Sequence, residues 1–127
     1  MSDVVLDASA LLALLGEEVG ADAVAEHLPG ASISAVNLSE VVAKLADSGL
    51  VAEEISTAVS GLGLEVHAFD EQQAFAAGLL RPATRASGLG LGDRACLGLA
   101  RQLGVVALTA DRQWKSLRVG ARVQVLR

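Results

Sequence analysis

Three aspartates stand where carboxylates could do chemistry together. Asp7 follows the apolar run 4–6, and Asp111 comes just after the apolar run 105–109. In an open parallel sheet, ligands bind beyond the carboxyl ends of the strands, so these two side chains would share one edge. Each could instead be the N-cap of a following helix, which is the commoner role of a single aspartate.

Asp93 lies in line with an apolar stripe. The residues three, four, seven and ten positions further on are Cys96, Leu97, Ala100 and Leu103. A carboxylate directed toward the interior needs a partner or a cation. The alternative is again an N-cap, with the carboxylate turned back to the backbone.

Glu40 shows the opposite pattern. Its predicted helix, 37–47, buries one set of apolar residues: Leu38, Val41, Val42 and Leu45. Asn37, Glu40 and Lys44 fall on the other side, and the i, i+4 spacing of Glu40 and Lys44 is that of a common surface pair. Periodicity alone therefore predicts a solvated Glu40.

Strands and helices alternate along the chain. The predicted strands are 4–6, 31–34, 64–69, 105–109 and 122–126. The predicted helices are 8–15, 20–28, 37–47, 52–62, 70–80 and 93–103. This alternation predicts α/β class: a three-layer α/β/α sandwich with a mostly parallel five-stranded sheet. The length of 127 residues favours a single domain, 1–127.

Charge is distributed unevenly along the chain. Residues 1–80 carry 13 acidic residues and one basic residue, whereas residues 81–127 carry nine basic and two acidic residues. The overall net charge is -5. Such polarity predicts either a basic face for nucleic acid on an acidic protein or two halves that attract each other within the fold.

The same composition excludes several classes of protein. A lone cysteine, Cys96, excludes a disulfide framework and a multi-thiolate zinc site, and its place on the apolar stripe favours an inert buried thiol. The apolar run 8–15 is too short to span a bilayer, and the start Met1-Ser2-Asp3 shows no secretion signal. We therefore expect a cytoplasmic protein with no membrane partner.

Four segments together resemble the PIN-domain family, in particular VapC-type toxins of type II toxin–antitoxin systems. They are VVLDASALLALL (4–15), ISAVNLSEVV (33–42), GLGLGDRACLGLA (88–100) and LTADRQW (108–114). The resemblance implies a PIN-like fold and a metal-dependent endoribonuclease. It places the family's acidic quartet on Asp7, Glu40, Asp93 and Asp111, and the family's hydroxyl on Thr109. Gly90 stands where a serine is frequent in the family, and this difference affects the geometry of the glycine-rich loop 88–92 before Asp93.

The implied chemistry is hydrolysis of RNA phosphodiester bonds by an activated water, with no protein nucleophile. Oxygen ligands suit Mg²⁺, with Mn²⁺ as an alternative, and such an ion relieves the repulsion between converging carboxylates. We expect Asp7 and Asp93 to bind the metal directly. Glu40 and Asp111 would hold metal-bound waters or a second ion. Ser9 and Thr109 would support the ligands by hydrogen bonds.

The resemblance also implies partners: a cognate antitoxin, a homodimer and a hetero-oligomer with the antitoxin. We expect the antitoxin to insert a cationic side chain into the acidic site and to lie along a groove walled by residues 9–62. RNA would approach over the basic half, where Arg94 and Arg112 directly follow two of the acids.

Two other classes of function stay open. One is a non-cleaving PIN-like module that binds RNA or protein, and the intact quartet counts against it. The other is a phosphoacceptor receiver domain. That class needs paired acids at the first strand and a lysine near the fifth, whereas Asp7 stands alone and no lysine closely follows Thr109.

Overall fold

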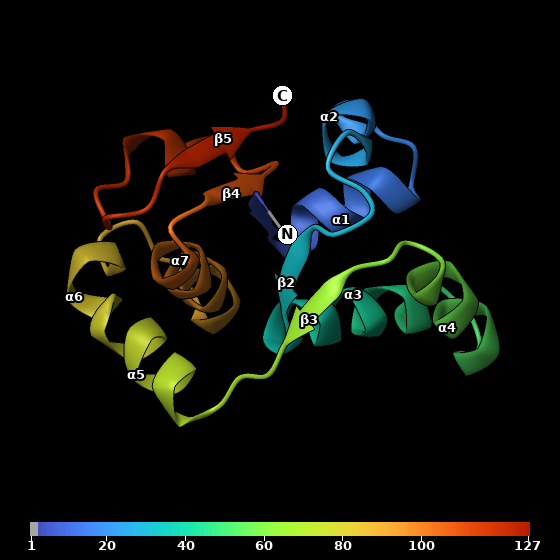
Figure 1. Cartoon of the computed structure of the whole chain (residues 1–127), viewed down its shortest axis with the longest axis horizontal. Coiled ribbons are helices and arrows are strands. Elements are labelled where there is room, and N and C mark those ends of the chain that lie inside the picture. Colours follow the sequence, from blue (N-terminus) through green and yellow to red (C-terminus); the bar gives the residue numbers. More distant parts are fainter. Residues whose placement is uncertain (1–2) are drawn as a thin grey trace.

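A single sheet of five parallel strands forms the centre of the protein. The computed structural model describes residues 3–127, and its strand order is β3-β2-β1-β4-β5 (Figure 1). The strands are β1 (Val4–Leu6), β2 (Ser32–Ser34), β3 (Glu65–His67), β4 (Val106–Thr109) and β5 (Val123–Val125). This confirms the predicted α/β class with its five-stranded parallel sheet.

Helices cover both faces of the sheet (Figure 1). They are α1 (Ala8–Leu15), α2 (Ala21–Ala25), α3 (Ala35–Asp47), α4 (Ala52–Ser60), α5 (Glu71–Leu79), α6 (Arg81–Thr84) and α7 (Leu91–Leu103). Side chains alternate along β1: Val5 packs with α7, whereas Val4 and Leu6 pack with α1 on the other face. The core therefore has two apolar layers, one on each side of the sheet.

The register of the two central strands brings two polar residues together. Leu6 of β1 pairs with Leu108 of β4, and the Asp7 N–H donates to the Leu108 carbonyl at 3.1 Å. Both strands are buried and end at the same edge. Asp7 and Thr109 therefore lie side by side at the carboxyl edge of the sheet.

Two helices differ from their predicted form at positions that matter for the site. α7 begins at Leu91 with Gly90 as its N-cap, so Asp93 lies in the first turn rather than before it. α3 begins at Ala35, and its Asn37 is fully buried. The placement of Asn37 on a solvent face was wrong, because α3 packs against α7 as well as against the sheet.

The prediction that Val42 is buried was also wrong. With α3 packed against α7, the Val42 side chain is 38% exposed. The short helix α6 was not predicted, whereas the 3₁₀ helix η1 (Arg112–Ser116) is the helix that the N-cap alternative for Asp111 implied. η1 carries Trp114, which is fully buried in the core layer beside α7. None of the helices in residues 3–127 has the length and apolar composition needed to cross a membrane.

Candidate active site

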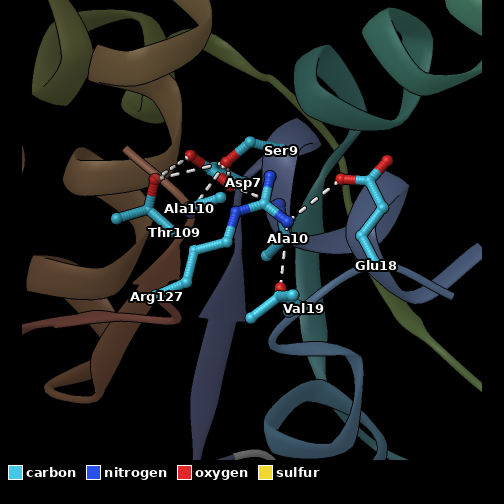
Figure 2. A network of polar contacts seen from close by, with 8 residues as sticks. All are labelled: Asp7, Ser9, Ala10, Glu18, Val19, Thr109, Ala110 and Arg127. Atoms are coloured by element: carbon cyan, nitrogen blue, oxygen red, sulfur yellow. Dashed lines mark hydrogen bonds and ion pairs between the residues drawn. The ribbon is translucent and has the colours of Figure 1, made fainter. Parts of the chain in front are cut away.

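Asp7 is the most tightly held carboxylate of the edge. It is buried, and one oxygen, Oδ1, accepts hydrogen bonds from the Ser9 hydroxyl at 2.7 Å and from the Ala10 N–H at 2.8 Å. The Thr109 hydroxyl donates to the other oxygen, Oδ2. Figure 2 shows these three donors converging on Asp7 from α1 and from the end of β4. Asp7 is thus the N-cap of α1 and at the same time a member of an inter-strand network.

The two hydroxyls that contact Asp7 also fix the neighbouring chain. Ser9 Oγ accepts from the Ala110 N–H at 2.9 Å, and Thr109 Oγ1 accepts from the Asp111 N–H at 3.0 Å. The first bond joins the start of α1 to the turn after β4 (Figure 2), and the second lies within that turn. Because the donors are held from both sides, the Asp7 carboxylate has one defined orientation.

Burial raises the pKa of Asp7 above its usual value. Hydrogen bonds from Thr109, Ser9 and Ala10 oppose that rise, and the nearby negative charge of Asp93 adds to it. In these surroundings a nearby cation stabilises the ionised form of the carboxylate, because the cation offsets both the lost hydration and the repulsion from Asp93.

Asp93 lies in the first turn of α7 and is partly buried. Its Oδ2 accepts from the Gly90 N–H at 3.1 Å. Burial is the main cause that raises its pKa, the Gly90 N–H lowers it, and the charge of Asp111 raises it. Asp93 therefore turns one oxygen back to the backbone, as the N-cap alternative expected, while the negative charge of Asp111 raises its pKa.

Glu40 reaches the same helix end from α3. The residue as a whole is exposed, but its carboxylate lies against Gly92, where an added Cβ would stand 2.2 Å from Oε2. The Asn37 amide donates to Glu40 Oε1 at 3.0 Å. The acid expected from periodicity to be solvated thus lies beside the residue that precedes Asp93.

Asp111 follows β4 and begins η1. Its Oδ1 accepts from the Gln113 N–H at 2.9 Å, which is an N-cap bond. The negative charge of Asp111 raises the pKa of Asp93, so the two carboxylates lie within electrostatic reach of each other.

The pKa of the Cys96 thiol depends on three of the four acids. Cys96 lies on α7 one turn after Asp93 and is fully buried. Burial raises its pKa well above the usual value, and the charges of Asp7, Asp93 and Glu40 raise it further. Three acids from three different elements therefore act on one buried atom, and the thiol itself is inert at neutral pH.

The acids do not enclose a metal by themselves. Among residues 3–127, no group of three or more Asp, Glu, His or Cys side chains is close enough to hold an ion. Mg²⁺ usually takes only one or two carboxylates directly and keeps several waters. An all-oxygen set fits such an ion when it includes two carboxylates with a raised pKa, the buried Asp7 and the partly buried Asp93.

The two arginines that follow acids have different surroundings. Arg94 is partly buried, and its Nη1 donates to the Ala77 carbonyl at 3.2 Å, so it links α7 to α5. Arg112 is exposed, and its Nε donates to the carbonyl of Arg127 at 3.0 Å. Of the two, Arg112 is the side chain available at the surface.

A cavity of about 500 Å³ lies between α1 and α3. It is lined by Ser9, Leu12, Leu15, Gly16, Glu18, Lys44, Leu45, Ser48 and Arg127. Ser9 is the residue that contacts Asp7, so one end of this cavity adjoins the acidic network. Arg127 lies across it, with its Nη1 bonded to Glu18 Oε1 at 3.1 Å and to the Val19 carbonyl at 2.9 Å (Figure 2).

The chain belongs to the PIN domain family, because the family model of the PIN domain matches residues 4–120. No curated protein sequence gives a significant match. The membership agrees with the parallel sheet and with the acids gathered at its carboxyl edge.

Solved structures share the fold over nearly the whole chain. The DNA-bound VapBC of Salmonella typhimurium is 23% identical with a TM-score of 0.76 and covers 100% of both chains. A toxin–antitoxin complex from Klebsiella pneumoniae is 17% identical with a TM-score of 0.77 and covers 98% of both. VapC20 of Mycobacterium tuberculosis, a sarcin–ricin loop cleaving toxin, is 15% identical with a TM-score of 0.74 and covers 94% of this chain and 98% of its own. These likenesses show the fold.

Sequence reasoning did not identify two residues that shape the site. The Asn37 amide binds the Glu40 carboxylate and Gly92 leaves room for it, yet Asn37 was assigned to a solvent face and Gly92 was given no role. The available signal was weak: a polar residue one helical turn before an acid, and a glycine directly before another acid.

Proposed function

We propose that this protein is a metal-dependent endoribonuclease that acts as the toxin of a toxin–antitoxin pair. The observation that carries the proposal is the pair of carboxylates formed by the buried Asp7 and the partly buried Asp93, because the pKa of each is raised by burial and by a neighbouring acid. Neither forms an ion pair with a lysine or arginine among residues 3–127. Such a costly arrangement is typical of a cation site.

Asp7 and Asp93 are the residues that we propose as direct ligands of Mg²⁺ or Mn²⁺. Glu40 and Asp111 would hold water around the ion, and Ser9 and Thr109 would keep Asp7 in place. A divalent cation bound there supplies a more acidic water and charge stabilisation for the scissile phosphate.

The chain itself contributes orientation. Three donors hold Asp7 in one orientation, and the Gly90 N–H binds one oxygen of Asp93, which leaves the second oxygen of Asp93 for a ligand. Glu40 and Asp111 are carboxylates that can accept a proton from an attacking water at the same edge. No serine, cysteine or histidine nucleophile is needed for this hydrolysis.

We propose that RNA approaches the edge over the basic half, with Arg112 as a phosphate contact. Arg112 is exposed and follows Asp111, so its guanidinium can reach a phosphate next to the acids. Arg94 is not proposed as a phosphate contact, because its side chain is bonded to α5. Its role in this proposal is its positive charge, which lowers the pKa of Asp93.

We propose the cavity between α1 and α3 as the place of the antitoxin segment. Its lining combines apolar side chains, including Leu12, Leu15 and Leu45, with the carboxylate of Glu18. A short amphipathic segment could bury its apolar residues there and direct an arginine or lysine past Ser9 toward Asp7.

We further propose that the chain is a single domain that works in the cytoplasm as a homodimer bound to its antitoxin. The exposed apolar side chains of α5, Phe75 at 65% and Leu79 at 76%, offer a surface for a second copy. Sedimentation of Leu79→Glu beside the unchanged protein tests this: the dimer should shift toward monomer.

Cleavage of a defined RNA by the purified protein tests the activity. We expect cleavage with Mg²⁺ or Mn²⁺, none with EDTA, and recovery when the ion is restored. RNA binding without cleavage in either metal would indicate the non-cleaving PIN-like module instead.

A further inference from the structure

Two residues, Asn37 and Gly92, determine where the carboxylate of Glu40 lies. Asn37 Nδ2 donates to Glu40 Oε1 at 3.0 Å and to the Gly92 carbonyl at 2.9 Å. Asn37 is only 1% exposed. The amide thus joins α3 to the first turn of α7 at the point where the Glu40 carboxylate rests.

The orientation of this amide follows from its neighbours. Glu40 Oε1 and the Gly92 carbonyl are both acceptors, so the donor group Nδ2 must face them. The amide oxygen, Asn37 Oδ1, is then buried and has no partner among the residues described. Buried acceptors normally have a donor, and a bound water beside the Glu40 carboxylate would supply one.

Glycine is required at position 92 because the Glu40 carboxylate fills the space of a side chain there, and not because the backbone conformation needs a glycine. It lies within the helix α7, and a Cβ there would meet Glu40 Oε2 at 2.2 Å and Oε1 at 2.4 Å. These contacts are far below any real separation, and both are to the end of a flexible side chain. Any side chain at position 92 would therefore displace the Glu40 carboxylate and leave the helix backbone in place.

We propose that Asn37 and Gly92 are positioning residues that hold Glu40 beside Asp93, an inference that rests on the proposed role of Glu40 in the metal site. Without them, a surface glutamate keeps several rotamers. The Asn37 amide selects one of these rotamers through a hydrogen bond, and the missing Cβ of Gly92 leaves room for the carboxylate.

The decisive variant is Gly92→Ala, with Gly78→Ala as its matched control. Both glycines are helical, and alanine favours a helix over glycine, so neither variant should lower the melting temperature. At Gly78 an added Cβ meets nothing within 4 Å. Only Gly92→Ala should displace Glu40.

Mn²⁺ binding measured by calorimetry gives the first readout. We expect Gly92→Ala to bind Mn²⁺ roughly 10–100-fold more weakly, the usual loss when a group supporting a metal ligand is altered. Gly78→Ala should match the unchanged protein. In a Glu40→Gln background, Gly92→Ala should add little, because the residue it acts through is already altered. A Gly92→Ala protein that is folded and binds Mn²⁺ with unchanged affinity would overturn the proposal.

A second readout does not depend on the metal site. The side-chain amide protons of Asn37 should exchange slowly in the unchanged protein and in Gly78→Ala, and faster in Gly92→Ala. If the unchanged protein binds no Mn²⁺, the proposed function fails. The exchange rate of the Asn37 amide protons then decides by itself whether Asn37 and Gly92 position Glu40. Equal exchange in all three proteins would contradict that positioning role.

Discussion

At the scale of single residues, Asp7 combines two roles that sequence analysis treated as alternatives. Its Oδ1 caps α1 through the Ala10 N–H, and its Oδ2 accepts from Thr109 across the sheet. The cap orients the carboxylate, and burial makes its charge costly. An N-cap carboxylate can therefore also belong to a hydrogen-bond network that joins two strands.

The substitution Asp7→Asn should raise stability and abolish cleavage. The raised pKa of Asp7 means that ionisation costs the folded state free energy at neutral pH, and asparagine removes that charge while its amide keeps the shape. Loss of a charged metal ligand should lower cleavage on the order of 100-fold or more. Thermal melts in EDTA and RNA cleavage assays check both effects. A variant that is less stable at pH 7 would contradict the stated cost of this charge.

The pH dependence of that stability difference has a definite sign. As the pH falls through the raised pKa of Asp7 toward about 4, the ordinary aspartate pKa, the unchanged protein takes up a proton and its penalty fades. The melting-temperature advantage of Asp7→Asn should therefore be full at pH 7 and shrink toward zero near pH 4. A constant advantage over this range would mean that the effect does not come from the carboxylate charge.

At the scale of elements, the start of α7 organises the site. The helix brings Asp93 in its first turn and Gly92 beside Glu40, and α3 packs against it through Asn37. The positive end of the helix dipole also favours carboxylates there. The contact between α3 and α7 thus determines which face of α3 lies against the start of α7.

This contact also explains what the sequence could and could not predict. All five strands were predicted because short local patterns identify them: β1 and β4 are mainly apolar runs, and β3 alternates polar and apolar residues. The faces of α3 were not, because Asn37 is polar and its burial depends on a carbonyl of Gly92, 55 positions away in the chain. The approach of Glu40 to α7 was expected from the family resemblance and not from periodicity.

The cavity between α1 and α3 yields a prediction about inhibition. Lys44 lines it and is exposed, so Lys44→Trp should fill part of the space without disturbing the core. An antitoxin segment should bind at least tenfold more weakly, or about 1.4 kcal/mol, while RNA cleavage stays unchanged. The control is Ala43→Trp at an exposed position of α3 outside the cavity lining. Equal antitoxin affinity in both variants would place the segment elsewhere.

At the scale of the whole molecule, the two oppositely charged halves hardly pair with each other. Among residues 3–127, Arg127 is the one arginine or lysine that forms an ion pair, with Glu18 at 3.1 Å. Several other arginines donate to backbone carbonyls or lie at the surface. Direct ion pairs therefore account for little of the charge pattern, which agrees with the basic RNA surface that we propose.

Charge reversal at Arg112 tests that surface. Arg112→Glu should weaken RNA binding and reduce the slope of log affinity against log salt by about 0.7, the contribution of one phosphate contact on a single strand. Arg122→Glu is the matched control, since Arg122 bonds to the Gly104 carbonyl before β4, at the opposite edge of the sheet. Filter binding between low and moderate salt measures both. Identical slopes for the two variants would show that RNA does not track the acidic edge.

The central claim is that the acids at the carboxyl edge hold a divalent cation between β1 and α7. Anomalous diffraction from crystals equilibrated with Mn²⁺ tests it most directly, because it locates the ion without reference to activity. We predict a peak within roughly 2.0–2.3 Å of a carboxylate oxygen of Asp7 or Asp93, with Glu40 and Asp111 around its waters. A saturated crystal with no peak at this edge, or with its peak at another part of the surface, would contradict the account.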